Sequence, residues 1–237
     1  MEDVKQKGGL KMKRIKEKKS TLERNHLIKY FDFIGEEEKK LVKKWYLGQE
    51  GVTKEQEKFL NIVEKALAIR YDFLIANMEP SLSNKGEIYY KEGEKVGRNI
   101  SCSNWEKKAK NFAPQYQSHL ANLRELFLYY AYRIAMGYWT LEYVCDNSST
   151  DGNYWMSPCS SHGIDLSAAK KVGGARDGIG NTYKIVKNNS GFALCGGSCV
   201  NEEAVYCVSD VCNYNITNNV CHYGSGVLVL NPTGLIN

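Results

Sequence analysis

The sequence lacks several features that would assign it to a class at once. No apolar run reaches the ~18–20 residues that a membrane-spanning helix needs, which excludes a polytopic membrane protein. Only 4 of the 237 residues are proline, and the 21 glycines follow no triplet repeat, which excludes a collagen-like chain. The first residues contain no signal-peptide core and no small-residue cleavage site. Because no strong catalytic motif is present either, we expect a protein that is not an enzyme.

Charged residues and cysteines occupy opposite parts of the chain. Lys, Arg, Asp and Glu are concentrated before about residue 110, whereas seven of the 8 cysteines follow residue 144. We therefore expect an α+β protein, in which an N-terminal helical bundle or hairpin precedes a small disulfide-rich antiparallel β domain. The predicted regions are a disordered basic arm over 1–20, a helical region over 21–144 and a Cys-rich β and loop domain over 145–237.

Apolar residues at three- and four-residue steps predict the helices of the region 21–144. The clearest helix begins after Thr53, which has Gln56 at capping-box spacing, and its apolar stripe runs through about residue 76. Pro114 suits the first turn of a second long helix, which the pattern extends to about Val144. The other expected elements are helices over 22–34 and 41–46, a loop or hairpin over 81–97, and strands over 182–186, 204–208 and 226–230.

The cysteines are predicted to form disulfides that hold together a loop-rich domain with a thin core. Disulfides favour an extracellular or cell-surface location, and four Asn-x-Ser/Thr sequons beside turn-like residues favour it as well. Cys102, the one cysteine of the helical region, could tie the two parts together through Cys145 or Cys159. The disulfide candidates are Cys102, Cys145, Cys159, Cys195, Cys199, Cys207, Cys212 and Cys221.

Two other chemistries remain open for these cysteines. A structural zinc ion could be bound by Cys195, Cys199, Cys207 and Cys212, although their spacing differs from the usual two-residue knuckles. A nucleophilic thiol could be paired with a nearby imidazole, as in Cys159 with His162 and Asp165, or in Cys221 with His222. We expect no cofactor, with zinc as the alternative.

The stretch Phe112-Ala113-Pro114-Gln115-Tyr116-Gln117, followed by a helix with Arg124 and then by the Cys-rich region, resembles part of some bacterial type IV pilins. In those subunits a Pro-Gln-Tyr-Gln stretch lies within a long N-terminal helix, which leads into a small antiparallel sheet closed by a C-terminal disulfide loop. The resemblance implies the same order of helix and sheet. The chain departs from the pilins at residues 99–110, which are polar where a pilin has its apolar segment.

These observations predict a non-enzymatic extracytoplasmic surface or assembly protein with a disulfide-stapled recognition domain, and the resemblance implies a pilin-like one. Its expected partner is another protein or a second copy of itself, with no membrane span and no nucleic acid. The alternative is an intracellular effector or adaptor, with a Cys-based zinc site and a basic arm that binds nucleic acid or an acidic partner.

Overall fold

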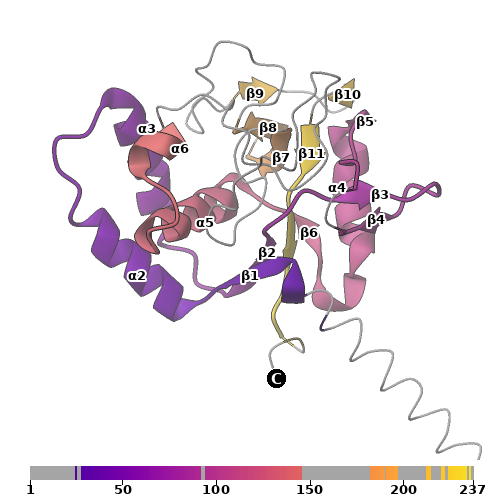
Figure 1. The fold of residues 1–237 in the computed structure, drawn as a ribbon, viewed down its shortest axis with the longest axis horizontal. Coiled ribbons are helices and arrows are strands. Elements are labelled where there is room, and N and C mark those ends of the chain that lie inside the picture. Colours follow the sequence, from indigo (N-terminus) through magenta and orange to yellow (C-terminus); the bar gives the residue numbers. More distant parts are fainter. Residues whose placement is uncertain are drawn as a thin grey trace, which may run out of the picture.

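The structure is a computed structural model, which describes residues 25, 28–91, 94–145, 182–189, 191–196, 212–214, 220–221, 224–233 and 235. In these residues, helices cover both faces of a central sheet (Figure 1). The helices are α2 (Glu36–Tyr46), α3 (Lys54–Ala66), α4 (Cys102–Phe112), the short 3-10 helix η1 (Pro114–Tyr116), α5 (Leu123–Ala135) and α6 (Leu141–Cys145). Helices α2, α3, α5 and α6 lie on one side of the strands, and α4 lies on the other.

The central sheet is antiparallel and has the strand order β1-β2-β12-β6, with β1 at Phe31–Ile34, β2 at Phe73–Ala76, β12 at Leu228–Leu230 and β6 at His119–Leu120. Its side chains alternate between two buried clusters, as successive residues of a strand must. Phe73 and Ile75 pack with residues of α3 and α5, whereas Leu74 and Ala76 pack with Trp105 of α4. Because both faces are covered, β2 is apolar at every position.

A second sheet has the order β11-β7-β8-β9, with β7 at Tyr183–Asn188, β8 at Gly191–Cys195, β9 at Cys212–Tyr214 and β11 at Gly224–Gly226. Strand β11 runs parallel to β7, and after Val227 the chain continues as β12 into the central sheet. Strand β10 (Val220–Cys221) pairs with β5 (Ile100–Ser101). The C-terminal strands therefore pair with strands on both sides of the predicted boundary at residue 145.

Helix α3 confirms the predicted capping box. The Thr53 hydroxyl accepts a hydrogen bond from the Gln56 amide at 3.2 Å, and the Gln56 side chain accepts one from the Thr53 amide at 3.1 Å. The predicted end of this helix is wrong, because α3 ends at Ala66 and residues 73–76 form β2. A short, continuous apolar run fits a buried strand as well as a helix, and the pairing with β12 decides between them.

The predicted long helix from Pro114 to Val144 is also wrong. The chain forms η1, turns at Gln117 with a left-handed φ of 51°, and adds β6 to the central sheet before α5 begins. The side chain of Asn122 caps α5 by accepting from the Glu125 amide, and Gly137, with a φ of 75°, follows its C-terminal end. The Pro-Gln-Tyr-Gln stretch of this chain therefore lies outside any long helix, whereas in a pilin it lies within one.

The mixed α+β class is confirmed, but the region 21–144 is not helical throughout, since it contains β1 to β6 as well. The hairpin expected over 81–97 is present as β3 (Ser81–Leu82) paired with β4 (Ile88–Tyr89). The predicted arm over 1–20 and the predicted strand over 204–208 lie outside the described residues. Within the part described, every helix is too short or too polar to cross a bilayer.

Candidate functional site

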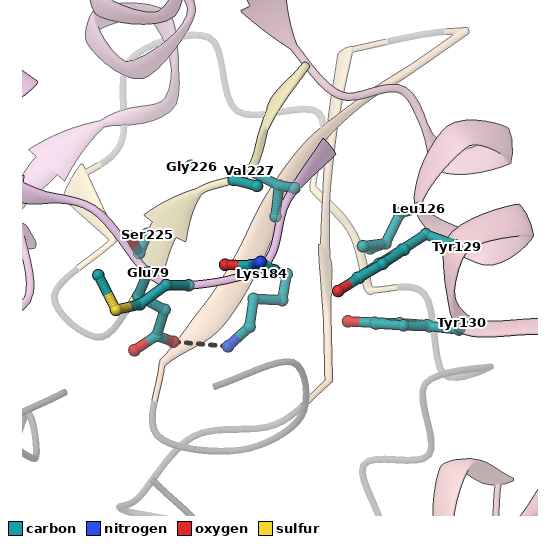
Figure 2. A pocket seen from close by; sticks show the side chains of 11 residues that line it. Glu79, Leu126, Tyr129, Tyr130, Lys184, Ser225, Gly226 and Val227 are labelled. Carbon is teal, nitrogen blue, oxygen red and sulfur yellow. Dashed lines mark hydrogen bonds and ion pairs between the residues drawn. The ribbon is translucent and has the colours of Figure 1, made fainter. Parts of the chain in front are cut away.

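A fully buried ion pair lies between the two sheets. Glu79 and Lys184 are 3% exposed each, and the Lys184 ammonium donates to Glu79 Oε1 at 2.6 Å. The same oxygen accepts from the backbone amide of Thr182 at 3.1 Å and from its hydroxyl. Figure 2 shows Tyr129 and Tyr130 of α5 pointing toward this pair. The pair ties the segment after β2 to the beginning of β7.

The space beside this pair is too small for a substrate. It has a volume of about 20 Å³ and is lined by Asn77, Ser225 and the two tyrosines, among others. Ser225 Oγ and Asn77 Oδ1 are buried there with no hydrogen-bond partner in the described part of the chain. A volume of this size holds about one water molecule. We therefore assign this centre to the interior scaffold.

A second buried polar cluster surrounds Asp32 of β1. Its carboxylate accepts from the Tyr129 hydroxyl at 2.7 Å, from the side-chain amide of Asn77 at 3.2 Å and from the Arg133 guanidinium at 3.3 Å. Burial and the neighbouring Asp32 carboxylate raise the pKa of Tyr129 well above its ordinary value. These contacts join β1, β2 and α5, so the cluster stabilises the core.

The predicted disulfide residues divide between several places. Cys102 is a free, buried thiol in the cluster around α4, and burial raises its pKa. Cys145 and Cys195 are both buried in the other cluster, so the expected tie between Cys102 and Cys145 is wrong. The strand registers place the backbone of Cys212 opposite Leu194 and that of Cys221 opposite Ile100. No disulfide is found in the described part of the chain, and Cys159, Cys199 and Cys207 lie outside it.

The alternatives to disulfides stay predictions. Of the four zinc candidates, Cys195 is buried in an apolar cluster, and Cys199 and Cys207 lie outside the described residues. The partners of the candidate nucleophiles also lie outside the described residues; they are His162, Asp165 and His222. No group of three His, Cys, Asp or Glu side chains that could hold a metal is found among the described residues.

An open groove with a volume of about 650 Å³ lies where the end of α3, the beginning of α5 and the turn between β7 and β8 meet. We call it the basic groove. Its lining includes four cationic side chains, and no Asp or Glu is among its described lining residues. The lining residues are Ile62, Lys65, Ala68, Ile69, Arg70, Tyr71, Asn122, Leu123, Arg124, Lys187, Asn188 and Asn189.

Three of the four cations have no internal counter-charge. Lys65, Arg70 and Arg124 are exposed, and no described carboxylate forms an ion pair with any of them. Lys187 is half-buried, 3.3 Å from Glu106 and 4.6 Å from the ring centroid of Phe192. The groove therefore presents positive charge that the scaffold does not neutralise.

The floor of the groove is held by a buried carboxylate. Glu125 is 0% exposed; it accepts from the Tyr71 hydroxyl and, at 2.8 Å, from the Asn122 amide, and it lies 3.3 Å from the His119 ring. Burial, with help from Glu125, raises the pKa of Tyr71, so its hydroxyl stays protonated. Burial lowers the pKa of His119, but Glu125 and the Gln117 carbonyl outweigh it and raise that pKa. When its ring is protonated, His119 offsets the charge of Glu125.

Tertiary pairing assembles the groove from distant parts of the chain. The Lys187 amide donates to the Ala121 carbonyl at 2.7 Å, which brings the end of β7 beside the first residues of α5. The amides at the beginning of α5 add a partial positive charge beside Arg124. The cations of this site are scattered along the sequence, so no motif marks it. The spacing of Asn122 and Glu125, which fits a capping box, is the one local signal.

Comparisons with protein families, curated proteins and solved structures find no match to this chain. Its chemistry can therefore be argued from the geometry alone. The groove has cations, amides and one fixed tyrosine ring, and its described lining offers no acid–base pair or nucleophile. This arrangement suits the binding of an anionic ligand.

Proposed function

We propose that this protein is a non-catalytic recognition protein that binds an anionic partner in the basic groove. The observation that carries the proposal is the uncompensated charge of Lys65, Arg70 and Arg124 around one open hollow. The buried ion pair of Glu79 and Lys184 supports it, because this centre lies in a space too small for a substrate.

Retention on an anionic resin tests this proposal. The groove variant Arg70→Glu/Arg124→Glu reverses two charges in the groove, and the control variant Lys54→Glu/Lys107→Glu reverses two exposed charges that lie outside its lining. We expect the groove variant to elute at clearly lower salt than the wild type and the control variant to shift much less. Equal shifts would show that retention reports net charge alone, and the proposal would then be rejected.

We also propose that the protein works outside the cytoplasm, as a surface or assembly protein whose Cys-rich part is held by disulfides. The supporting observations are the seven cysteines after residue 144 and the sequons. Because Cys102 is a free thiol and seven cysteines remain, at least one more must also be unpaired. Alkylation of unreduced, denatured protein from its native source should therefore find at least two free thiols and fewer than eight. Eight free thiols would contradict this location.

A further inference from the structure

The basic groove continues into a second hollow of about 700 Å³ between α2 and α3. We call it the helical hollow. Both are lined by Ala68, Ile69 and Arg70, so Arg70 faces both spaces. The lining of the helical hollow also includes Glu36 and Glu64, and Lys39 is paired with Glu36 and Asp72, whereas no described carboxylate forms an ion pair with Lys43. An elongated ligand with more than one negative charge can therefore contact Arg70 and Lys43 together.

The uncharged residues that line the basic groove indicate which class of anionic ligand it suits. Asn189 is exposed, and its side-chain amide can bind a hydroxyl group of a sugar ring, whereas the Oδ1 atoms of Asn122 and Asn188 already accept from the Glu125 and Asn189 backbone amides. Tyr71 is 48% exposed, and its bond to Glu125 fixes the ring, which offers an apolar face to the C–H side of a sugar. Ile62 and Leu123 add apolar surface beside it.

The same lining disfavours the other anionic polymers. Single-stranded nucleic acid is bound by successive aromatic side chains, whereas the described lining has one aromatic residue in each hollow, Tyr71 in the basic groove and Tyr46 in the helical hollow. An acidic peptide often binds by adding a strand to an open sheet edge. Strand β7, which carries Lys187, is already paired with β11 and β8 and has no open edge.

We infer that the basic groove and the helical hollow together bind an acidic polysaccharide, a chain of sugar rings bearing carboxylate or sulfate groups. The inference rests on the proposed function and names its ligand class. Carboxylate and sulfate groups both accept paired hydrogen bonds from the guanidinium groups of Arg70 and Arg124.

Calorimetric titration of the full chain tests the ligand class. The probes are a heparin octasaccharide, polygalacturonate, an oligo-dT of twenty nucleotides, polyglutamate and neutral dextran. We expect the octasaccharide or polygalacturonate to bind most tightly, and the groove variant to lose at least about tenfold in affinity at physiological salt. Binding of both would indicate any acidic sugar, whereas binding of heparin alone would indicate sulfate. The control variant should remain within about twofold of the wild type.

Three further variants test whether the ligand spans both hollows and whether a sugar ring stacks on Tyr71. Lys43→Gln should weaken the octasaccharide and leave a heparin disaccharide unchanged, because the shorter probe does not span both hollows. Tyr71→Phe keeps the ring but loses the bond to Glu125, so it should retain more of the affinity than Tyr71→Leu, which removes the ring. Equal binding by both Tyr71 variants, or an equal effect of Lys43→Gln on both probes, would overturn the inference.

The outcomes separate this inference from the proposed function. If oligo-dT or polyglutamate binds most tightly and the groove variant abolishes that binding, the ligand class is wrong while the groove remains an anion site. If no probe binds, both the inference and the proposed function fail. If the control variant weakens binding as much as the groove variant, the contact is diffuse and both fail as well.

Discussion

Removal of the Lys184 ammonium is the sharpest test of the buried scaffold. Lys184→Met keeps a side chain of similar length and leaves Glu79, 3% exposed, with the hydrogen bonds that the Thr182 amide and hydroxyl donate. Loss of one member of a buried pair costs about 3–5 kcal/mol, because the other charge stays buried without compensation. We expect the free energy of unfolding, measured by urea titration with circular dichroism, to fall by this amount.

The exposed pair of Lys40 and Glu37 supplies the matched control. Their side chains are 68% and 80% exposed and lie 2.7 Å apart. Lys40→Met should therefore leave the free energy of unfolding nearly unchanged. The double variant Glu79→Gln/Lys184→Met should lose less than the sum of its two single variants, because neither charge is left alone. If Lys184→Met costs no more than Lys40→Met, the buried pair is not the structural tie we describe.

Three further predictions follow from single residues. The free energy of unfolding should fall as the pH rises above about 6.5, because the raised pKa of His119 means that the folded state binds a proton more tightly than the unfolded state does. His119→Gln should remove this contribution to the pH dependence. A pH dependence that His119→Gln leaves unchanged would contradict the role of His119. Gly226→Ala should cost about 1–3 kcal/mol in urea unfolding, because its Cβ would lie 2.7 Å from the Trp105 ring, and an unaltered midpoint would contradict this packing. Cys102 should resist iodoacetamide in the native protein and react after denaturation, as mass spectrometry of peptides would show; rapid native labelling would contradict its burial.

Local signals could predict the elements that depend on local interactions. The capping box of Thr53 and Gln56 lies within one turn, so it marks the beginning of α3 whatever packs against the helix. The strand at Phe73–Ala76 could not be recognised in this way. Its partner, β12, lies more than 150 residues away, and four apolar residues in a row fit a helix equally well.

The candidate site could be predicted even less, for the same reason. Lys65, Arg124 and Lys187 lie on three different elements, and they line one groove because the backbone at Lys187 pairs with the segment before α5. A sequence in which Lys and Arg are common offers no sign that these three share a surface. The cysteine pattern is a stronger signal in the sequence than these scattered cations, and much of it lies outside the described residues.

Backbone amide NMR of the full chain, titrated with the heparin octasaccharide, tests the central claim most directly. We expect shifts at residues 65, 68–71, 122–124 and 187–189, which line the basic groove, and at Lys43 in the helical hollow. We expect no shift at the hairpin of β3 and β4, on the other side of the central sheet. Shifts that are absent from the groove, or that are as large at the hairpin, would contradict the assignment of this groove as the binding site.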